Sequence, residues 1–435
     1  MASALFLFAI LVKICFSSDI RDNSFARIRN KPTFVDKTPL IYEFLKHKYL
    51  FINAPSKFGK STNLDMIGLF LSSHRPKKVI ENQFIWTKIW ESEEFVRNNL
   101  GQYPVIHFNL KIRGYSSNYE HTFTSFKVSL YNAFIEHAYL LESEKLGEDQ
   151  IKMLEIYTDL TNIKLLDTDT VANGLAFLAD VLYQHHGKQV ILLADEFGRG
   201  ITEGILKNHL DLSLVVGLYS SILNTTFHNS TVISHALLCG ESWIYGLKGP
   251  AVSLIERVSF MQRIEFSRFY GFTYDEVDRL MAKFNTSKEE KVEGLKWYGG
   301  YSSYDGLFKV CNPFSIIEYL SHKNTMVFWT GSALAPDLVR RMLEVDNLKR
   351  LILDLVTKKT VNMNLEKDIK IVEVEFIRNK VEELPQYCEN FFLQVLTEAG
   401  FLTFAENQMQ SNNVFLKFPN EEVLSAVVKY TVLKT

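Results

Sequence analysis

The sequence predicts an α/β protein with a mainly parallel sheet covered by helices on both faces, followed by a mostly helical C-terminal domain. Two observations lead to this fold class. Within residues 30–265, short apolar runs alternate with longer segments in which apolar residues recur at helical spacing. After about Phe266 the strand signals become sparse. Because 435 residues suffice for two domains, we expect the first domain at 30–265 and the second at 266–435.

The first domain is expected to contain four strands, each a short apolar run that fits a buried strand. Since helices lie between them, the strands should run parallel. Ahead of the first strand, Phe34–Phe44 fits an extended entry and a short helix that begins near Pro39. The expected strands are Tyr49–Asn53, Val105–Asn109, Gln189–Ala194 and Thr231–Cys239. The expected helices are Lys60–Leu71, about Thr122–Leu141, Val171–His186 and about Leu206–Phe227.

The second domain begins with a helix start that the sequence marks clearly. Thr273 is followed three residues later by Glu276, which is the spacing of a capping box. Near the end of the chain we expect a helix at about Tyr387–Ala399. A small β-hairpin is expected to pair Phe401–Phe404 with Val414–Phe418.

A loop with the chemistry of a phosphate-binding site follows the first strand. In such a loop, inward-facing backbone N–H groups and a Lys hold the phosphates, and a Ser or Thr hydroxyl binds the metal ion. Ala54 stands where the general motif has its first Gly. The alternative is an ordinary helix start with a solvated Lys60. The candidate phosphate-binding residues are Pro55, Ser56, Lys57, Phe58, Gly59, Lys60, Ser61 and Thr62.

The third predicted strand ends abruptly in the carboxylate pair Asp195-Glu196. An Asp at this place holds Mg²⁺, and the Glu after it can orient and deprotonate an attacking water molecule. Ser61 and Asp195 are therefore the candidate metal-binding residues, and Glu196 is the candidate catalytic residue. The alternative is a strand that ends in a polar turn. The presence of both motifs in this order, separated by α/β units, favours a nucleotide site.

Other candidate site residues carry weaker signals. Glu241 and Ser242 follow the fourth predicted strand and could face a terminal phosphate, although a plain turn is the simpler interpretation. Arg199, Arg257 and Arg268 could act as arginine fingers, with surface salt bridges as the alternative for each. The pair His185-His186 has no acidic metal partner at helical spacing, and neither a Gly-x-Ser-x-Gly turn nor zinc-ligand spacing is visible.

With these motifs the chain resembles the AAA-ATPase-like domain family of P-loop proteins over about Thr33–Val423. Beyond the phosphate loop and the segment 193–197, the resemblance rests on five stretches. These are Phe34-Val-Asp-Lys-Thr-Pro-Leu-Ile, Tyr270-Gly-Phe-Thr-Tyr-Asp-Glu-Val, Trp297-Tyr-Gly-Gly-Tyr, Asn312-Pro-Phe-Ser and Phe418-Pro-Asn-Glu-Glu-Val.

The resemblance implies ATP binding at Lys60 and Ser61, Mg²⁺ at Asp195 and a hydrolytic role for Glu196. The chain departs from the family at four positions. The family usually carries Arg in place of the first Gly, where Ala54 stands, and also at the positions of Ser56 and Lys57. Gly198 replaces a usual Asp. Many bacterial members continue into a restriction-type nuclease domain; since this sequence ends soon after Asn420, we expect neither that domain nor nuclease activity here.

Composition and charge limit the classes of partner. The formal net charge is −2 and the pI about 6.6, so bulk electrostatics indicate neither a nucleic acid nor an anionic membrane. A physiological protein partner and the oligomeric state are not determined by the sequence, although AAA-type relatives often form rings.

Residues 1–18 have the pattern of a signal peptide. The apolar run Ala4–Val12 is too short to span a bilayer, and Ser17 and Ser18 suit a cleavage site, whereas Lys13 interrupts the apolar stretch. A buried N-terminal segment is the alternative. No second apolar run of membrane length follows, so a soluble, secreted mature protein is expected.

Two further features bear on secretion. The sequons at Asn224, Asn229 and Asn285 would be glycosylated in the secretory pathway. After cleavage an odd number of cysteines, Cys239, Cys311 and Cys388, would remain, which makes a disulfide framework unexpected and leaves a single bridge open.

The leading functional hypothesis is an exported protein that binds ATP and Mg²⁺, with hydrolysis less strongly supported than binding. One alternative is a secreted pseudo-ATPase that acts as a binding or effector module without turnover. Another is a cytosolic NTPase whose N-terminus only resembles a signal peptide.

Overall fold

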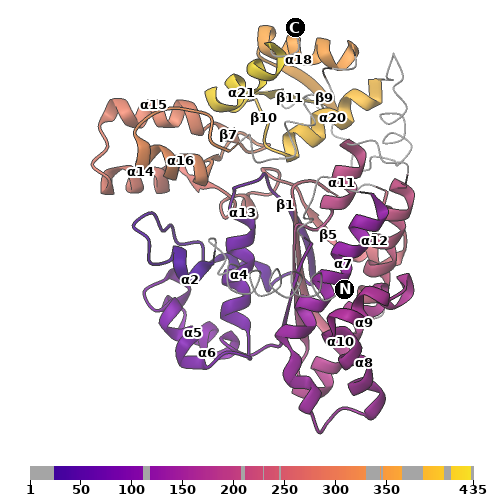
Figure 1. Ribbon diagram of the computed structural model, residues 1–435. Helices are drawn as coiled ribbons and strands as arrows, with labels where there is room; N and C mark the ends of the chain where they lie inside the picture. Colours follow the sequence, from indigo (N-terminus) through magenta and orange to yellow (C-terminus); the bar gives the residue numbers. More distant parts are fainter. Residues whose placement is uncertain are drawn as a thin grey trace, which may run out of the picture.

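The computed structural model describes residues 24–110, 118–206, 211–228, 230–243, 246–329, 343, 346–364, 386–405 and 413–432. At its centre lies a parallel five-stranded sheet with the strand order β2-β3-β4-β1-β5 (Figure 1). This confirms the predicted fold class. The strands are β1 (Tyr49–Asn53), β2 (Val105–Asn109), β3 (Val190–Asp195), β4 (Ile233–Gly240) and β5 (Glu256–Val258).

The four predicted strands form with boundaries shifted by at most two residues, because each is a run of buried apolar side chains. All six residues of β3 are buried, as expected for a central strand covered on both faces. The edge strand β5 was not predicted. Its three residues, of which only Val258 is buried, are too few to show a period.

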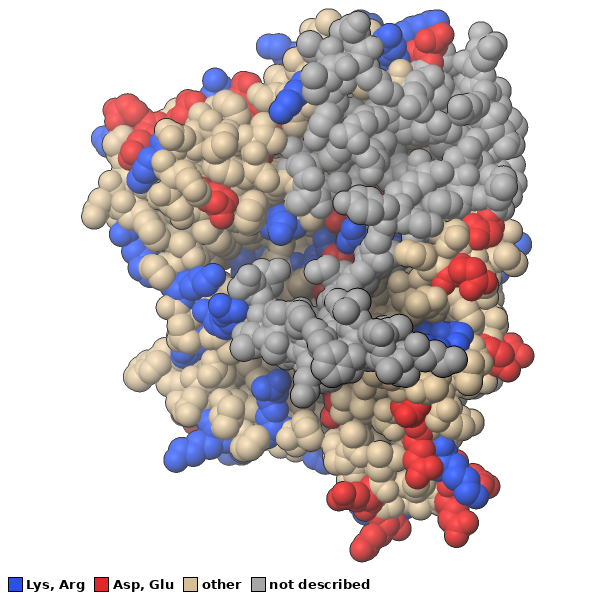
Figure 2. All heavy atoms as spheres, in the orientation of Figure 1, with Lys and Arg blue, Asp and Glu red and all other residues tan. Residues whose placement is uncertain are grey.

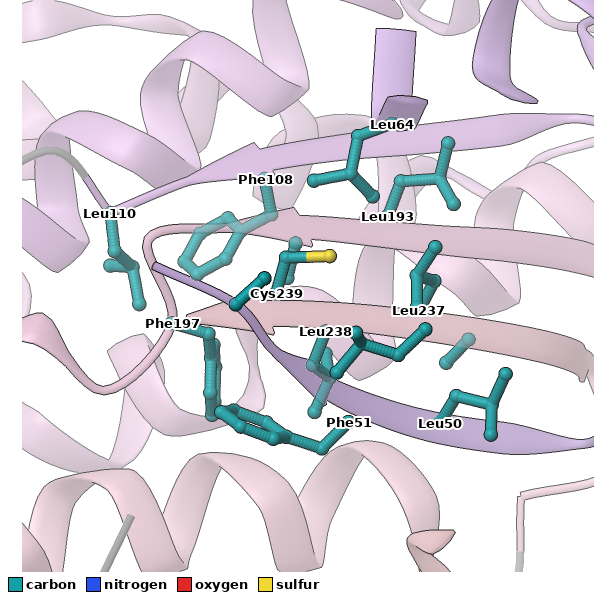
Figure 3. Close-up of a cluster of buried hydrophobic side chains, with 14 of the residues drawn as sticks. Leu50, Phe51, Leu64, Phe108, Leu110, Leu193, Phe197, Leu237, Leu238 and Cys239 are labelled. Atoms are coloured by element: carbon teal, nitrogen blue, oxygen red, sulfur yellow. The ribbon is translucent and has the colours of Figure 1, made fainter. Parts of the chain in front are cut away.

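Helices cover both faces of the sheet. Helix α4 (Lys60–Leu71) lies on one face, and α7 (Tyr119–Glu136), α10 (Thr168–His186) and α12 (Leu212–Phe227) cover the other (Figure 1). Figure 3 shows Leu64 of α4 on one side of the strands and Phe51 and Phe197 on the opposite side. Helix α4 approaches closely at Gly68, where an added Cβ would lie 2.2 Å from the ring of His107.

Shorter helices surround this core. The predicted helix at Leu206–Phe227 corresponds to α12 and is preceded by a separate helix, α11 (Arg199–Leu206). The predicted short helix after Pro39 is α3 (Leu40–Phe44). The others are α2 (Phe25–Ile28), α5 (Lys77–Phe84), η1 (Lys88–Glu91), α6 (Glu93–Asn99), η2 (Ala138–Glu142), α8 (Glu148–Thr158), α9 (Leu160–Leu165), η3 (Pro250–Leu254) and α13 (Ile264–Ser267).

The region after Phe272 begins with a small helical unit. Helices α14 (Tyr274–Lys283), α15 (Lys288–Tyr298) and α16 (Pro313–His322) pack around a separate hydrophobic cluster. The predicted capping box is confirmed: the Glu276 N–H donates to the Thr273 hydroxyl, and the Thr273 N–H donates to the Glu276 carboxylate. A small antiparallel sheet of β6 (Phe272–Thr273), β8 (Lys309–Cys311) and β7 (Tyr301–Ser302) completes this unit.

The last part of the chain is called the C-terminal unit below. The predicted hairpin is confirmed by the antiparallel pair β10 and β11, but β9 adds a third strand on the far side of β11. The second half of the chain therefore carries two small sheets instead of one hairpin. The unit consists of α18 (Asp346–Lys358), β9 (Val361–Asn364), α20 (Gln386–Glu398), β10 (Thr403–Phe404), β11 (Asn413–Lys417) and α21 (Glu421–Val432).

The C-terminal unit shares its hydrophobic core with the parallel sheet. Phe391, Phe401 and Leu416 belong to the same buried cluster as Phe51 and the other sheet residues. In Figure 1 the orange and yellow elements of this unit lie beyond the end of the sheet at which β1 is labelled. A continuous core means that the unit is fastened to the sheet by apolar burial and is not simply tethered through the chain.

The surface is mixed in charge. Figure 2 shows Asp and Glu gathered over the tip that carries α8, where Glu144, Glu148 and Asp149 are exposed, while Lys and Arg are spread over other regions. In the described part of the chain, no helix combines the length and the apolar character needed to cross a bilayer. Cys239 and Cys311 are free and buried. The expected signal peptide, the Asn229 sequon and the Cys388 side chain lie outside what the structure describes.

Candidate functional site

The carboxyl ends of the central strands meet at one edge of the sheet. Asn53, the last residue of β1, pairs with Gly240 at the end of β4, and Ala194 of β3 pairs with Leu238 of β4. The loop after β1 and the carboxylates after β3 are therefore separated only by the width of β4. In open parallel sheets, ligands bind beyond the carboxyl ends of the strands.

The backbone of the phosphate loop is shaped by two residues with positive φ. Gly59, which precedes α4, has φ 94°, and Lys57 has φ 66°. Gly adopts this left-handed conformation without strain, which explains why the motif needs it there. The N-terminus of α4 has no side-chain cap, so its first-turn amides and the positive end of the helix dipole are suited to hold an anionic ligand.

Lys60 lies inside the loop. The residue is 5% exposed, and its ammonium group donates hydrogen bonds to the carbonyls of Ala54 at 2.7 Å and Pro55 at 2.9 Å. The two carbonyl groups replace part of the hydration that the charge loses on burial. They keep the side chain within the loop, where a phosphate would approach it.

Ser61 and Asp195 are brought into contact. The Ser61 side chain lies close enough to the Asp195 carboxylate to lower its pKa through hydrogen bonding, and the Glu196 N–H donates to the Oδ1 atom of Asp195 at 3.0 Å. Burial, and then the charge of Glu196, raise the pKa of Asp195, while Ser61 and Lys60 oppose this shift. The two residues predicted to bind the metal thus lie in one site, with Asp195 buried and Ser61 half-buried, although they lie far apart in the sequence.

This pair suits a magnesium ion. Mg²⁺ prefers oxygen ligands and is commonly held by one or two carboxylate or hydroxyl groups together with water and substrate phosphates. The hydroxyl of Ser61 and the carboxylate of Asp195 are such ligands, and the two groups lie close enough for Ser61 to lower the pKa of Asp195. The residues present therefore fit the ion.

Glu196 lies beside this pair but faces a different part of the edge. It has φ 55°, and its Oε2 atom lies 3.5 Å from the Nη1 atom of Arg199. The Thr202 and Ser242 hydroxyls are 3.0 Å apart nearby. A small hollow at this place is lined by Glu196, Gly198, Arg199, Thr202, Glu241 and Ser242. The structure thus groups the weaker candidates Glu241 and Ser242 with the candidate base.

The remaining predicted loop residues have different surroundings. Ser56 and Thr62 are half-buried, and Lys57 is exposed with its Nζ atom 5.0 Å from the ring centroid of Phe314. Phe58 is fully buried, and its ring lies among aromatic side chains from outside the loop. Phe58 is therefore in the loop as predicted, but only its backbone is placed to serve a nucleotide.

Several residues around the loop were not predicted as site residues. Trp329 and Tyr301 surround Phe58, Gly400 contacts Pro55, and the Phe269 carbonyl accepts a hydrogen bond from Asn63 of α4. Two aromatic residues that contact the loop lie in stretches on which the family resemblance rests: Tyr301 in Trp297-Tyr-Gly-Gly-Tyr and Phe314 in Asn312-Pro-Phe-Ser. This resemblance was the only feature of the sequence that could have pointed to them. Among the three candidate arginine fingers, Arg257 instead forms an ion pair with the buried carboxylate of Glu398.

The motif stretches themselves contact one another. The Lys37 ammonium lies 2.7 Å from the carboxylate of Glu276, and the Ser315 hydroxyl lies 3.1 Å from that of Glu422. The Asn420 side chain donates to the Gly299 carbonyl at 2.8 Å. Stretches that are scattered along the sequence thus form one connected support behind the phosphate loop.

Comparison with known proteins agrees with this geometry. No curated protein matches the chain. The model of a protein family described as predicted AAA-ATPase matches residues 20–245, which include the phosphate loop, Asp195 and Glu196. This match spans just over half of the 435 residues. The chain therefore belongs to the AAA-ATPase-like family, whose P-loop site suggests nucleotide binding.

Proposed function

We propose that this chain binds ATP together with Mg²⁺ at the loop Pro55–Thr62 and at Asp195, and that it hydrolyses ATP with Glu196 as the base. The observation that carries the proposal is the contact between Ser61 and Asp195 at the edge where Lys60 also lies. The groups that would bind phosphate and metal lie together at this edge, which is the arrangement that phosphoryl transfer requires.

Each residue would have a distinct role. The amides of the first turn of α4 would hold the phosphate oxygens, and Lys60 would exchange the carbonyls of Ala54 and Pro55 for phosphate oxygens. Ser61 and Asp195 would hold Mg²⁺, which neutralises charge on the phosphates when bound. Glu196 would accept the proton of the attacking water, and Arg199 would orient the Glu196 carboxylate.

Replacing Lys60 by Ala should weaken ATP-Mg binding by about ten- to hundredfold, because a charge-assisted hydrogen bond of roughly 1.5–3 kcal/mol is lost. The dissociation constant can be measured by titration calorimetry, with the thermal shift caused by ATP-Mg as a second readout. Lys46→Ala is a matched control, because Lys46 is exposed on the surface beside Glu43. Equal ATP affinity of wild type and Lys60→Ala would contradict the proposed site.

We also propose that the protein is exported, with residues 1–18 as the signal peptide. The support is the apolar run Ala4–Val12 followed by Ser17 and Ser18. N-terminal sequencing of protein produced in eukaryotic cells with a secretory pathway tests this directly. A mature chain that retains Met1 would favour the cytosolic alternative.

The sequons should differ in occupancy if the chain is exported. Asn285 is exposed, whereas the Asn224 amide donates to the carbonyls of Ser220 and Lys248 and accepts from the Ala251 N–H. A glycan on Asn224 would break these bonds and would meet Gly249, whose ideal Cβ position lies 2.0 Å from the Asn224 Nδ2 atom. Glycopeptide mass spectrometry of folded, secreted protein should find glycan on Asn285 and none on Asn224. A glycan on Asn224 in folded protein would refute this prediction.

A further inference from the structure

We propose that residues outside the sheet hold the phosphate loop in a fixed shape and thereby control nucleotide affinity, with Phe58 and Pro55 as positioning residues. The residues that contact the loop are Tyr301, Trp329 and Gly400, and Glu398 links them to the sheet; these four residues are called the loop clamp below. This inference rests on the proposed nucleotide binding and adds a control of affinity from the second half of the chain.

The first contact is the burial of Phe58. Its side chain is 0% exposed, although it belongs to a loop that has to receive a ligand. Its ring makes edge contacts with Phe260 at 5.1 Å, with Tyr301 at 4.9 Å and with Trp329 at 6.3 Å between centroids. Aromatic pairs of this geometry are worth about 0.5–1.5 kcal/mol each beyond the burial of their area. The ring therefore anchors the middle of the loop.

This anchor acts on the part of the loop that binds phosphate. Phe58 stands between Lys57, with φ 66°, and Gly59, with φ 94°. A residue other than Gly keeps a left-handed conformation only where its surroundings enforce it. The buried ring of the adjacent Phe58 holds Lys57 in this conformation. The direction of the loop amides therefore depends on the loop clamp.

The second contact is between Pro55 and Gly400. A Cβ added to Gly400 would lie 2.6 Å from the Cγ atom and 2.8 Å from the Cβ atom of Pro55, and 3.4 Å from the Trp329 ring. Gly400 also has φ 80°. The turn after α20 thus touches the residue whose carbonyl accepts a hydrogen bond from Lys60.

The third contact fastens the clamp to the sheet. Glu398, at the end of α20, is 3% exposed and forms an ion pair with Arg257 of β5. Its other oxygen accepts the Trp243 N–H at 3.0 Å, just beyond the end of β4. The Arg257 guanidinium lies 5.2 Å from the Trp243 ring. Helix α20 is therefore joined to β5 and to the segment after β4, near the edge at which the nucleotide would bind.

These contacts couple the loop to the C-terminal unit. Any adjustment of the loop when Lys60 leaves the Ala54 and Pro55 carbonyls must be accommodated at Phe58, Pro55 and Gly400. Two events that share a structural element influence each other by the same free energy in both directions. Nucleotide binding should therefore strengthen the docking of the C-terminal unit, and a loosened clamp should weaken nucleotide binding.

Two variants test whether a loosened loop clamp weakens nucleotide binding. Phe58→Leu removes the aromatic anchor, and Gly400→Ala pushes against Pro55 while leaving Phe58 intact. Each should raise the dissociation constant for ATP-Mg by at least about fivefold, the lower end of ordinary coupling between sites. Phe134→Leu is the matched control, because Phe134 of α7 is equally buried but stacks on Tyr157 of α8, away from the loop. It should lose stability as Phe58→Leu does and keep wild-type affinity.

Hydrogen exchange tests whether nucleotide binding strengthens the docking of the C-terminal unit. In wild type, saturating ATP-Mg should slow exchange of the amides in 386–404, and this protection should be lost in Phe58→Leu even when it is saturated with nucleotide. A purely structural role of Phe58 would leave the protection intact. If the wild type binds ATP-Mg and both Phe58→Leu and Gly400→Ala bind it with wild-type affinity, the proposed role of the loop clamp is wrong. The proposed nucleotide binding would then still stand. A wild type that binds no nucleotide would overturn both.

Discussion

Replacing Glu196 by Gln is expected to lower the rate of ATP hydrolysis by about 10²- to 10⁴-fold and to leave ATP-Mg affinity nearly unchanged. Gln has the shape of Glu but cannot accept the proton of an attacking water molecule. Glu196 lies next to Asp195 in sequence, and it lines the hollow shared with Arg199 and Ser242, whereas Asp195 is the residue that interacts with Ser61. The loss should therefore appear in kcat and only slightly in binding.

Phosphate release under saturating ATP-Mg, together with calorimetric affinity, measures both quantities. Glu241→Gln is the informative control, because Glu241 lines the same hollow and is the other carboxylate that could serve as base. If Glu241→Gln lowers the rate of ATP hydrolysis strongly and Glu196→Gln lowers it only slightly, Glu241 and not Glu196 would be the base. Tight ATP binding with negligible turnover that Glu196→Gln does not change would support the pseudo-ATPase alternative instead.

Acid should destabilise the protein between pH 6.5 and about pH 4 through a histidine cluster at the opposite edge of the sheet. The His137 Nε2 atom lies 3.2 Å from the carbonyl of Val105, the first residue of β2, and its Nδ1 atom lies 3.2 Å from the Tyr139 hydroxyl. The same hydroxyl lies 2.9 Å from the Nε2 atom of His186. The bonds join these three side chains in one network.

Burial is the main cause of the low basicity of these rings. Burial, and then the neighbouring His74, lower the pKa of His137 to about 4. Burial, followed by His185 and Lys145, lowers the pKa of His186 to about 4. Both rings are therefore neutral in the folded protein at neutral pH, and the unfolded chain takes up protons more readily than the folded one.

The direction of the pH effect on stability follows from this difference in proton uptake between the folded and the unfolded chain. Because the folded pKa is depressed, the stability associated with neutral His137 is fully present above pH 6.5 and is lost as the pH falls toward 4. At pH 5, His137 alone should lower the free energy of unfolding by about 2 kcal/mol. His186 adds a smaller amount, because solvent screens a half-exposed group.

Urea unfolding at pH 7.5 and pH 5 measures this loss. His137→Gln should destabilise the protein at pH 7.5 but reduce the difference between the two pH values. His121→Gln is the control, since His121 is exposed on α7. A difference between the two pH values that His137→Gln leaves unchanged would contradict the assignment to this cluster.

Local sequence determined the sheet and the two motifs because these depend on short-range physics. A run such as Val190–Asp195 favours a buried strand, and the carboxylate pair at its end then lies at the carboxyl edge of the sheet. Gly59 before Lys60 likewise marks a loop that turns into a helix. Each of these signals needs only a few neighbouring residues.

The short strands were not predicted, because their formation does not depend on neighbouring residues alone. Strands β5 to β9 contain two to four residues each, so they show no period, and they form because partners from elsewhere pair with them. The pair β9 and β11 joins residues on either side of α20, and no local pattern specifies that pairing. The helical reading of the second half was therefore incomplete.

The sequence by itself determined the parallel α/β core, the loop with Lys60 and Ser61, and the carboxylates Asp195 and Glu196. The tertiary structure alone decided that Ser61 contacts Asp195, that Glu196 lines a hollow with Arg199, and that the Phe58 side chain is buried in the core. The physical reason is distance along the chain. Backbone preferences act over a few residues, whereas the burial of Phe58 depends on packing with residues that only folding brings beside it.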